Sequence, residues 1–119
     1  MPSPSVLIVD ASADNREVLR TALSRRGLQI FEADAAEEGL QMARTHHPDV
    51  IVLDLEPERL DAETIRESFS KEATSQASRL IVLGKVRRGP TFAGGHVISK
   101  PYHFAPLVHT IEQLAAKAA

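Results

Sequence analysis

The sequence predicts an α/β domain built on a parallel sheet of five strands. Apolar runs of four or five residues alternate with segments of helical periodicity along the 119 residues, which is typical of βα units. The first run, at residues 6–9, lacks polar alternation, as expected of a strand that helices cover on both faces. Three runs close on a charged residue, and these residues are Asp10, Asp54 and Lys100.

The first strand is expected over residues 6–9 and the first helix over residues 14–26. Asp14 and Glu17 form a capping-box-like pair at the start of this helix, and Gly27 lies where a helix ends. The helical spacing of apolar positions predicts a buried stripe of Val18, Leu19, Ala22 and Leu23.

A second strand is expected over residues 28–32, followed by a helix to about residue 46. Asp34 and Glu37 repeat the capping pattern at the start of this helix. Pro48 breaks the helix before the third strand, because proline removes a backbone donor and clashes with the preceding turn.

The third and fourth strands are expected over residues 50–53 and 80–83, with a helix over residues 62–71 between them. Ile65 and Phe69 face inward from that helix. The pattern then changes, because the next segment contains glycine and proline in place of a helical stripe.

Residues 84–95 hold Pro90 and four glycines, so a stable helix is not expected there. A fifth strand follows over residues 96–99, and a last helix over residues 103–117. Pro106 falls in the first turn of that helix, where a missing N–H costs little. Its buried stripe is expected to comprise Leu107, Val108, Ile111 and Leu114.

Length and composition predict one domain over residues 1–119, with 43% hydrophobic and 25% charged residues. A formal net charge of −2 gives no basic field for direct nucleic acid binding. The absence of cysteine excludes disulfides and a thiolate nucleophile. Neither a signal peptide nor a membrane span is found, so a cytoplasmic location is expected by default.

The carboxyl ends of parallel strands lie at one edge of a sheet, so Asp10, Asp54 and Lys100 are expected to meet there. Two carboxylates and an ammonium group can hold a cation and accept a phosphoryl group. An acid after a single strand is often only the solvated start of a loop. The joint presence of all three residues favours a functional site.

The order of the elements and six motifs resemble the receiver domains of two-component response regulators. These motifs are VLIVD at 6–10, DNREVLR at 14–20, PDVIVLDL at 48–55, LDA at 60–62, IVLG at 81–84 and SKPY at 99–102. The resemblance implies a flavodoxin-like (CheY-like) doubly wound sheet with strand order 2-1-3-4-5.

The resemblance also implies a role for each residue of the predicted site. Asp54 would accept a phosphoryl group from a histidine kinase or phosphotransfer protein, and Lys100 would contact that group. Asp10 would be the remaining acid that binds Mg²⁺, and the bond between Lys100 and Pro101 is a candidate for the cis form. Such a domain signals through protein contacts, is not an enzyme in the ordinary sense, and often precedes an output domain.

The sequence departs from the family pattern at several positions. Ala11 stands where a second acid is usual, so Mg²⁺ affinity should drop, and Glu56 is a tentative substitute ligand. Gly84 replaces a threonine or serine that bonds the phosphoryl group, and Val97 replaces the aromatic switch residue and is expected to pack. The segment over 84–100 is shorter than usual, so the fourth helix is expected to be shortened or missing.

Two other functions remain open. A pseudo-receiver that acts as an interaction module indifferent to phosphate is compatible with Ala11, Gly84 and Val97. A small enzyme or flavin-binding protein on the same fold is disfavoured, because residues 11–15 form no glycine-rich phosphate loop.

Overall fold

The computed structural model describes residues 3–55, 59–84 and 95–118. Five parallel strands form one sheet in the order β2-β1-β3-β4-β5, which confirms the predicted fold class. The elements follow one another along the chain as β1 Ser5–Asp10, α1 Ala13–Ser24, β2 Gln29–Ala33, α2 Ala36–His46, β3 Val50–Asp54, α3 Ala62–Gln76, β4 Arg79–Leu83, β5 Gly95–Ile98 and α4 Phe104–Ala118.

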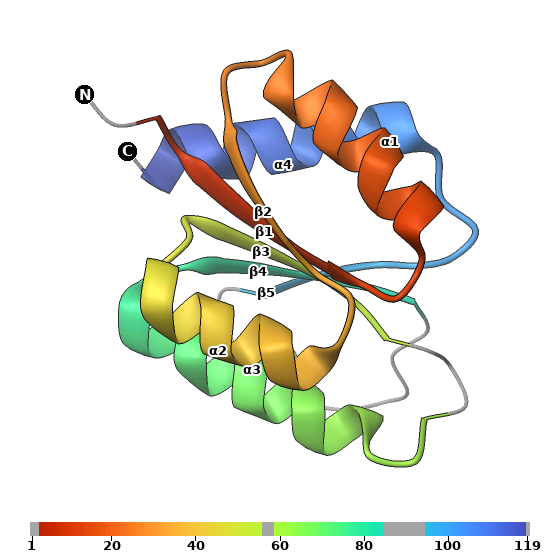
Figure 1. The fold of residues 1–119 in the computed structure, drawn as a ribbon, viewed down its shortest axis with the longest axis vertical. Coiled ribbons are helices and arrows are strands. Elements are labelled where there is room, and N and C mark those ends of the chain that lie inside the picture. Colours follow the sequence, from red (N-terminus) through yellow and green to blue (C-terminus); the bar gives the residue numbers. More distant parts are fainter. Residues whose placement is uncertain (1–2, 56–58, 85–94, 119) are drawn as a thin grey trace.

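Helices cover both faces of the sheet (Figure 1). Helices α1 and α4 lie on one face and contact each other, and α2 and α3 form a second pair on the other face. This arrangement explains why the central strands β1 and β3 are apolar at successive positions, since both of their faces are buried.

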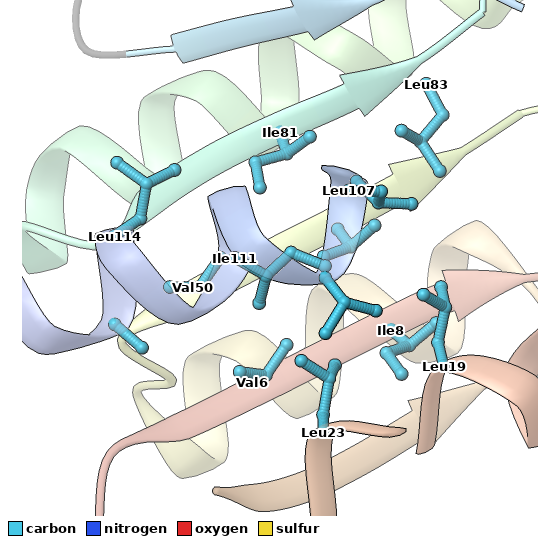
Figure 2. Packing of buried hydrophobic residues seen from close by; sticks show 13 residues of the cluster. Val6, Ile8, Leu19, Leu23, Val50, Ile81, Leu83, Leu107, Ile111 and Leu114 are labelled. Atoms are coloured by element: carbon cyan, nitrogen blue, oxygen red, sulfur yellow. The ribbon is translucent and has the colours of Figure 1, made fainter. Parts of the chain in front are cut away.

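Alternate residues of each strand point to opposite faces, so the core divides into two clusters. The cluster under α1 and α4 is closed by Leu19 and Leu23 from α1 (Figure 2). Its strand members point to the same face of the sheet and are Val6, Ile8, Val50, Val52, Ile81 and Leu83. Its members from α4 include the predicted stripe, namely Leu107, Val108, Ile111 and Leu114.

The cluster under α2 and α3 contains the strand residues that point to the opposite face of the sheet, including Leu7 and Val9 of β1. Phe69 of α3 is fully buried in this cluster, as predicted. Gly39 brings α2 close to the sheet, because a Cβ atom there would lie 2.6 Å from Val9 Cγ2. These contacts fix the height of α2 above the end of β1, where the site lies.

Several local predictions were wrong. The side chain of Val18 is 45% exposed, because α1 turns Leu19 and Leu23 toward the sheet. Ser12, and not Asp14, caps α1, since its hydroxyl accepts a hydrogen bond from the amide of Asn15.

The second and third helices also differ from their predicted starts and ends. Helix α2 begins after Ala35 with no side-chain cap, so the proposed pair of Asp34 and Glu37 does not close a capping box. Helix α3 continues to Gln76, beyond the predicted end, because Ala73 still packs in the core.

The connection from β4 to β5 includes residues 85–94, which lie outside the described part of the chain. The described residues hold four helices, and none of these lies between β4 and β5. The prediction that the fourth helix is shortened or missing concerns residues 85–94, which lie outside the described residues. Within the described ranges, no helix is long and apolar enough to cross a membrane.

Candidate functional site

Asp10 and Asp54 lie side by side at the carboxyl edge of the sheet. They are the last residues of β1 and β3 and are Cα partners in the register of these two strands. Each continues the parity of the strand residues that face α1 and α4, so the two side chains point toward the same face. The sheet itself therefore brings these two carboxyl groups together.

Lys100 reaches the same edge from the segment that follows β5. Its Nζ atom donates a hydrogen bond of 2.5 Å to Oδ1 of Asp54. The side chain of Asp54 is 6% exposed, and that of Lys100 is 36% exposed. The peptide bond between Lys100 and Pro101 is cis, as the sequence suggested. The structure thus places all three predicted residues in one cluster.

Asp10 is buried and only half satisfied by hydrogen bonds. Its Oδ1 atom accepts a bond of 2.9 Å from the amide of Ser12, at the start of α1. Its Oδ2 atom is buried and has no hydrogen-bond partner among the described residues. Arg16 donates to the backbone carbonyl of Asp10 at 2.6 Å, which holds the end of β1 against α1.

Burial raises the pKa of the Asp10 carboxyl above its ordinary value. The amide of Ser12 opposes this shift, and the negative charge of Asp54 adds to it. A carboxylate that is buried, unpaired on one oxygen and beside another acid gains stability from any cation that reaches it.

Tyr102 lies near the two acids and packs edge-to-face on Phe104, with ring centroids 5.6 Å apart. Burial raises the pKa of its hydroxyl to about 12, and the charges of Asp54 and Asp10 contribute to the shift. The pKa of this hydroxyl therefore depends partly on the charges of the two acids.

A cavity of about 120 Å³ opens beside Asp10 and Asp54. Its other lining residues come from the ends of β1, β2 and β3 and from the loops that follow, and they are Val9, Ala11, Asp34, Ala35, Ala36, Leu55 and Arg59. Room for one water needs only about 10–15 Å³, so the cavity accommodates a larger polar group. Asp54 is one of the residues that line this cavity.

Asp34 and Arg59 line this cavity, although the sequence analysis did not assign either of them to the site. Asp34 follows β2 directly, so its place at the carboxyl edge was a signal that could have identified it. Arg59 carried no such signal, because its position depends on the path of the loop after β3.

The positions that depart from the family pattern lie around the same edge. Ala11 lines the cavity, and its methyl group provides no ligand where a carboxylate was expected. Gly84 has a φ of +126°, a backbone conformation that residues with side chains rarely adopt. Val97 is 44% exposed and does not pack in the core, because β5 is an edge strand. Glu56 lies outside the described residues.

The cluster has the donors that a hard divalent cation such as Mg²⁺ prefers. Mg²⁺ is commonly held through one or two carboxylates together with waters and phosphate oxygens. Asp10 and Asp54 fit this requirement, and the unpartnered Oδ2 of Asp10 is the oxygen that would gain most from it. Within the described residues, no group of three histidine or acidic side chains is arranged to hold a metal by itself.

A family model for the response regulator receiver domain matches residues 6–88 of the chain. The ycf27 protein of Porphyridium aerugineum, a relative named as a transcriptional regulator, is 31% identical over 86 residues, which cover 72% of this chain and 36% of that protein. The KDP operon transcriptional regulatory protein KdpE of Escherichia coli strain K12 is 47% identical over 51 residues, or 43% of this chain and 23% of that protein. The chain thus matches about a third of the first relative and less than a quarter of the second.

Solved structures share the fold at lower sequence identity. The response regulator receiver domain protein (CheY-like) from Methanospirillum hungatei JF-1 superposes with a TM-score of 0.77 and 19% identity. The match covers 97% of this chain and 96% of the other. At this level of identity the likeness concerns the fold alone.

Proposed function

The chain belongs to the response regulator receiver domain family, and from this premise we propose that Asp54 accepts a phosphoryl group from a histidine kinase or phosphotransfer protein. The supporting observation is the hydrogen bond from Lys100 to Asp54 at 2.5 Å, beside Asp10 and an open cavity. Residues 1–119 would then act as one cytoplasmic signalling domain rather than as an enzyme.

The transfer needs little from the protein beyond a positioned carboxylate and positive charge. An oxygen of Asp54 forms a bond to phosphorus, and the bond from phosphorus to the donor breaks with its electron pair leaving on the donor. Lys100 already contacts Oδ1 of Asp54, which leaves Oδ2 as the attacking oxygen. The lysine ammonium also offsets charge on the phosphoryl oxygens after transfer.

Asp10 would hold Mg²⁺, with Glu56 as a tentative further ligand. Mg²⁺, when bound, supplies charge neutralisation at the phosphoryl oxygens. Ala11 removes one carboxylate from the usual set, so we propose a weak Mg²⁺ site. The raised pKa of Asp10 is consistent with this role, because a nearby cation would stabilise the charged carboxylate.

We propose that the domain signals through protein contacts with a fused or separate output domain, and that the phosphorylation switch is weak. Gly84 supplies no hydroxyl to the phosphoryl group, and Val97 supplies no aromatic side chain. A hydrogen bond to a charged group contributes roughly 1.5–3 kcal/mol, so its loss reduces the bias toward an active state by about tenfold to hundredfold.

Incubation with acetyl phosphate and Mg²⁺, followed by intact mass measurement, tests the proposal. The expected result is a gain of one phosphoryl group that disappears in Asp54→Asn and persists in Asp14→Asn, which removes an exposed acid in the first turn of α1. An Mg²⁺ titration of Glu56→Gln tests the substitute ligand, and unchanged affinity would retire it.

Absence of any gain at saturating Mg²⁺ would contradict the phosphoacceptor role. That outcome would favour the pseudo-receiver alternative, a module that binds partners without regard to phosphate. The family match gives this alternative no support of its own.

A further inference from the structure

Arg59 is the cationic residue among those that line the cavity beside Asp54. We propose that Arg59 binds the phosphoryl group carried by Asp54 and reduces the dependence of this site on Mg²⁺. This inference rests on the proposed function. It assigns to a loop residue the charge neutralisation that a divalent cation would otherwise supply.

The guanidinium of Arg59 is held in place by two acids. Its Nε donates to Oδ1 of Asp61 at 2.5 Å, and its Nη2 donates to Oε1 of Glu37 at 3.0 Å and to Oδ2 of Asp61 at 3.3 Å. Glu37 lies in the first turn of α2, so the arginine joins the loop after β3 to the start of that helix. These pairs keep the guanidinium near the wall of the cavity.

Donors of Arg59 remain available for an anion. A guanidinium has five N–H groups in a planar fork, and the bonds to Asp61 and Glu37 engage Nε and Nη2. Nη1 makes no hydrogen bond to any residue in the described part of the chain. Both acids are well exposed, with side-chain exposures of 55% and 76%, so these pairs are weak and the arginine can exchange one of them for a phosphate oxygen.

The charges around the cavity call for a second cation once a phosphoryl group arrives. Three acids, Asp10, Asp34 and Asp54, line it, whereas Arg59 is the lining cation and Lys100 pairs with Asp54 from the side. These three acids outnumber the two cations, and Glu37 and Asp61, which pair with Arg59, add further negative charge before a phosphoryl group arrives. An arginine binds phosphate oxygens with planar, paired donors, and its charge does not depend on pH or metal supply.

The test compares phosphorylation rates by intact mass, with acetyl phosphate as the donor, from excess EDTA to saturating Mg²⁺. We expect the native chain to gain one phosphoryl group in EDTA at a measurable rate. Arg59→Gln should lower the EDTA rate by about tenfold to hundredfold, the value of a hydrogen bond to a charged group, with a smaller loss at saturating Mg²⁺. The phosphorylation rate of Arg59→Lys in EDTA should lie between the rates of Arg59→Gln and of the native chain.

The matched control is Arg26→Gln, which removes an exposed arginine that pairs with Glu112 at 3.0 Å and does not line the cavity. Its rates should equal those of the native chain at every Mg²⁺ concentration. Thermal unfolding of each variant verifies that the fold is retained.

The outcomes separate the two proposals. Equal EDTA rates for Arg59→Gln and the native chain would overturn the role of Arg59 and leave Asp54 as the phosphoacceptor. The same conclusion follows if the native chain reacts with Mg²⁺ but not in EDTA. No phosphoryl gain under any condition would overturn both proposals together.

Discussion

Asp10 and Asp54 are direct register partners at the ends of two neighbouring parallel strands, with their side chains on the same face of the sheet. The pairing places two acids together where one oxygen of Asp10 has no partner among the described residues. Lys100 compensates Asp54 but makes no contact of this kind with Asp10. The fold therefore holds two acids together in an arrangement that attracts cations. When no cation is bound, this arrangement lowers the stability of the protein.

Asp10→Asn should stabilise the protein at neutral pH. The raised pKa of Asp10 means that the folded protein binds more protons than the unfolded chain between the ordinary value of 3.8 and the higher folded pKa. Stability therefore falls as pH rises through that interval, and the penalty persists above it. Urea unfolding should show a gain of about 1 kcal/mol at pH 7 and none below pH 3.8.

Asp34→Asn is the matched control for this experiment, because Asp34 is exposed at the same cavity. It should leave the pH profile unchanged. A lower stability of Asp10→Asn than of the native chain at pH 7 would mean that the hydrogen bond from Ser12 outweighs both the burial of the charge and the repulsion from Asp54.

Lys100→Met should destabilise the protein, because it leaves Asp54 without its ion-pair partner. The side chain of Asp54 is only 6% exposed, so the expected loss of about 1–3 kcal/mol exceeds that of a surface pair. The loss should shrink when Lys100→Met is made in an Asp54→Asn background, as measured by a double-mutant cycle in urea. Lys71→Met, at an exposed position of α3, provides the control.

If Lys100→Met lowers the free energy of unfolding equally in both backgrounds, the lysine stabilises the protein through packing of its hydrocarbon chain. The cycle therefore separates the charge of Lys100 from its hydrocarbon contacts.

The sequence was sufficient to predict the sheet and the meeting of three site residues. Uninterrupted apolar runs identify buried parallel strands, and the shared carboxyl edge of such strands then brings Asp10 and Asp54 together, as their register confirms. The chain order of strands and helices, together with the motif resemblance, supplied the strand order that the structure has.

Features that depend on neighbouring elements were not predictable in the same way. The apolar stripe of α1 fits Val18 as well as Leu19, and only the packing against the sheet leaves Val18 exposed. Ser12 and Asp14 are both suitable caps, so local chemistry alone did not identify the one in use. Arg59 lines the cavity from a loop, and no periodic sequence pattern predicts where a loop residue lies.

Tyr102 should report the charge of the site directly, because it is the single tyrosine of a chain without tryptophan. Its absorbance titration should have a midpoint of about 12 in the folded protein, against an ordinary value of 10.0. Asp54→Asn removes one of the charges that raise this pKa, so its midpoint should be lower. The native protein should also lose stability as pH rises from 10 toward 12, since the folded state then holds the extra proton.

The control is Asp14→Asn, which removes an exposed acid in the first turn of α1. In this variant the midpoint of the Tyr102 titration should match that of the native chain. Circular dichroism at each pH restricts the comparison to folded protein. A midpoint near 10 in folded native protein would place Tyr102 in contact with solvent and away from the two acids.

Substitutions at Gly84 should cost stability because of its backbone conformation. An added Cβ atom has no neighbour within 4 Å among the described residues, so the expected penalty comes from the φ of +126°. We expect losses of about 1–3 kcal/mol in urea, larger for Gly84→Thr than for Gly84→Ala, because β-branched residues tolerate positive φ least. Gly27→Ala, at a φ of +80° that is closer to the left-handed region, should lose less. If Gly84→Thr were as stable as the native chain, the backbone at the end of β4 would relax freely, and a hydroxyl could be restored there without cost. The expected loss instead means that a hydroxyl restored at this position by a single substitution would cost stability.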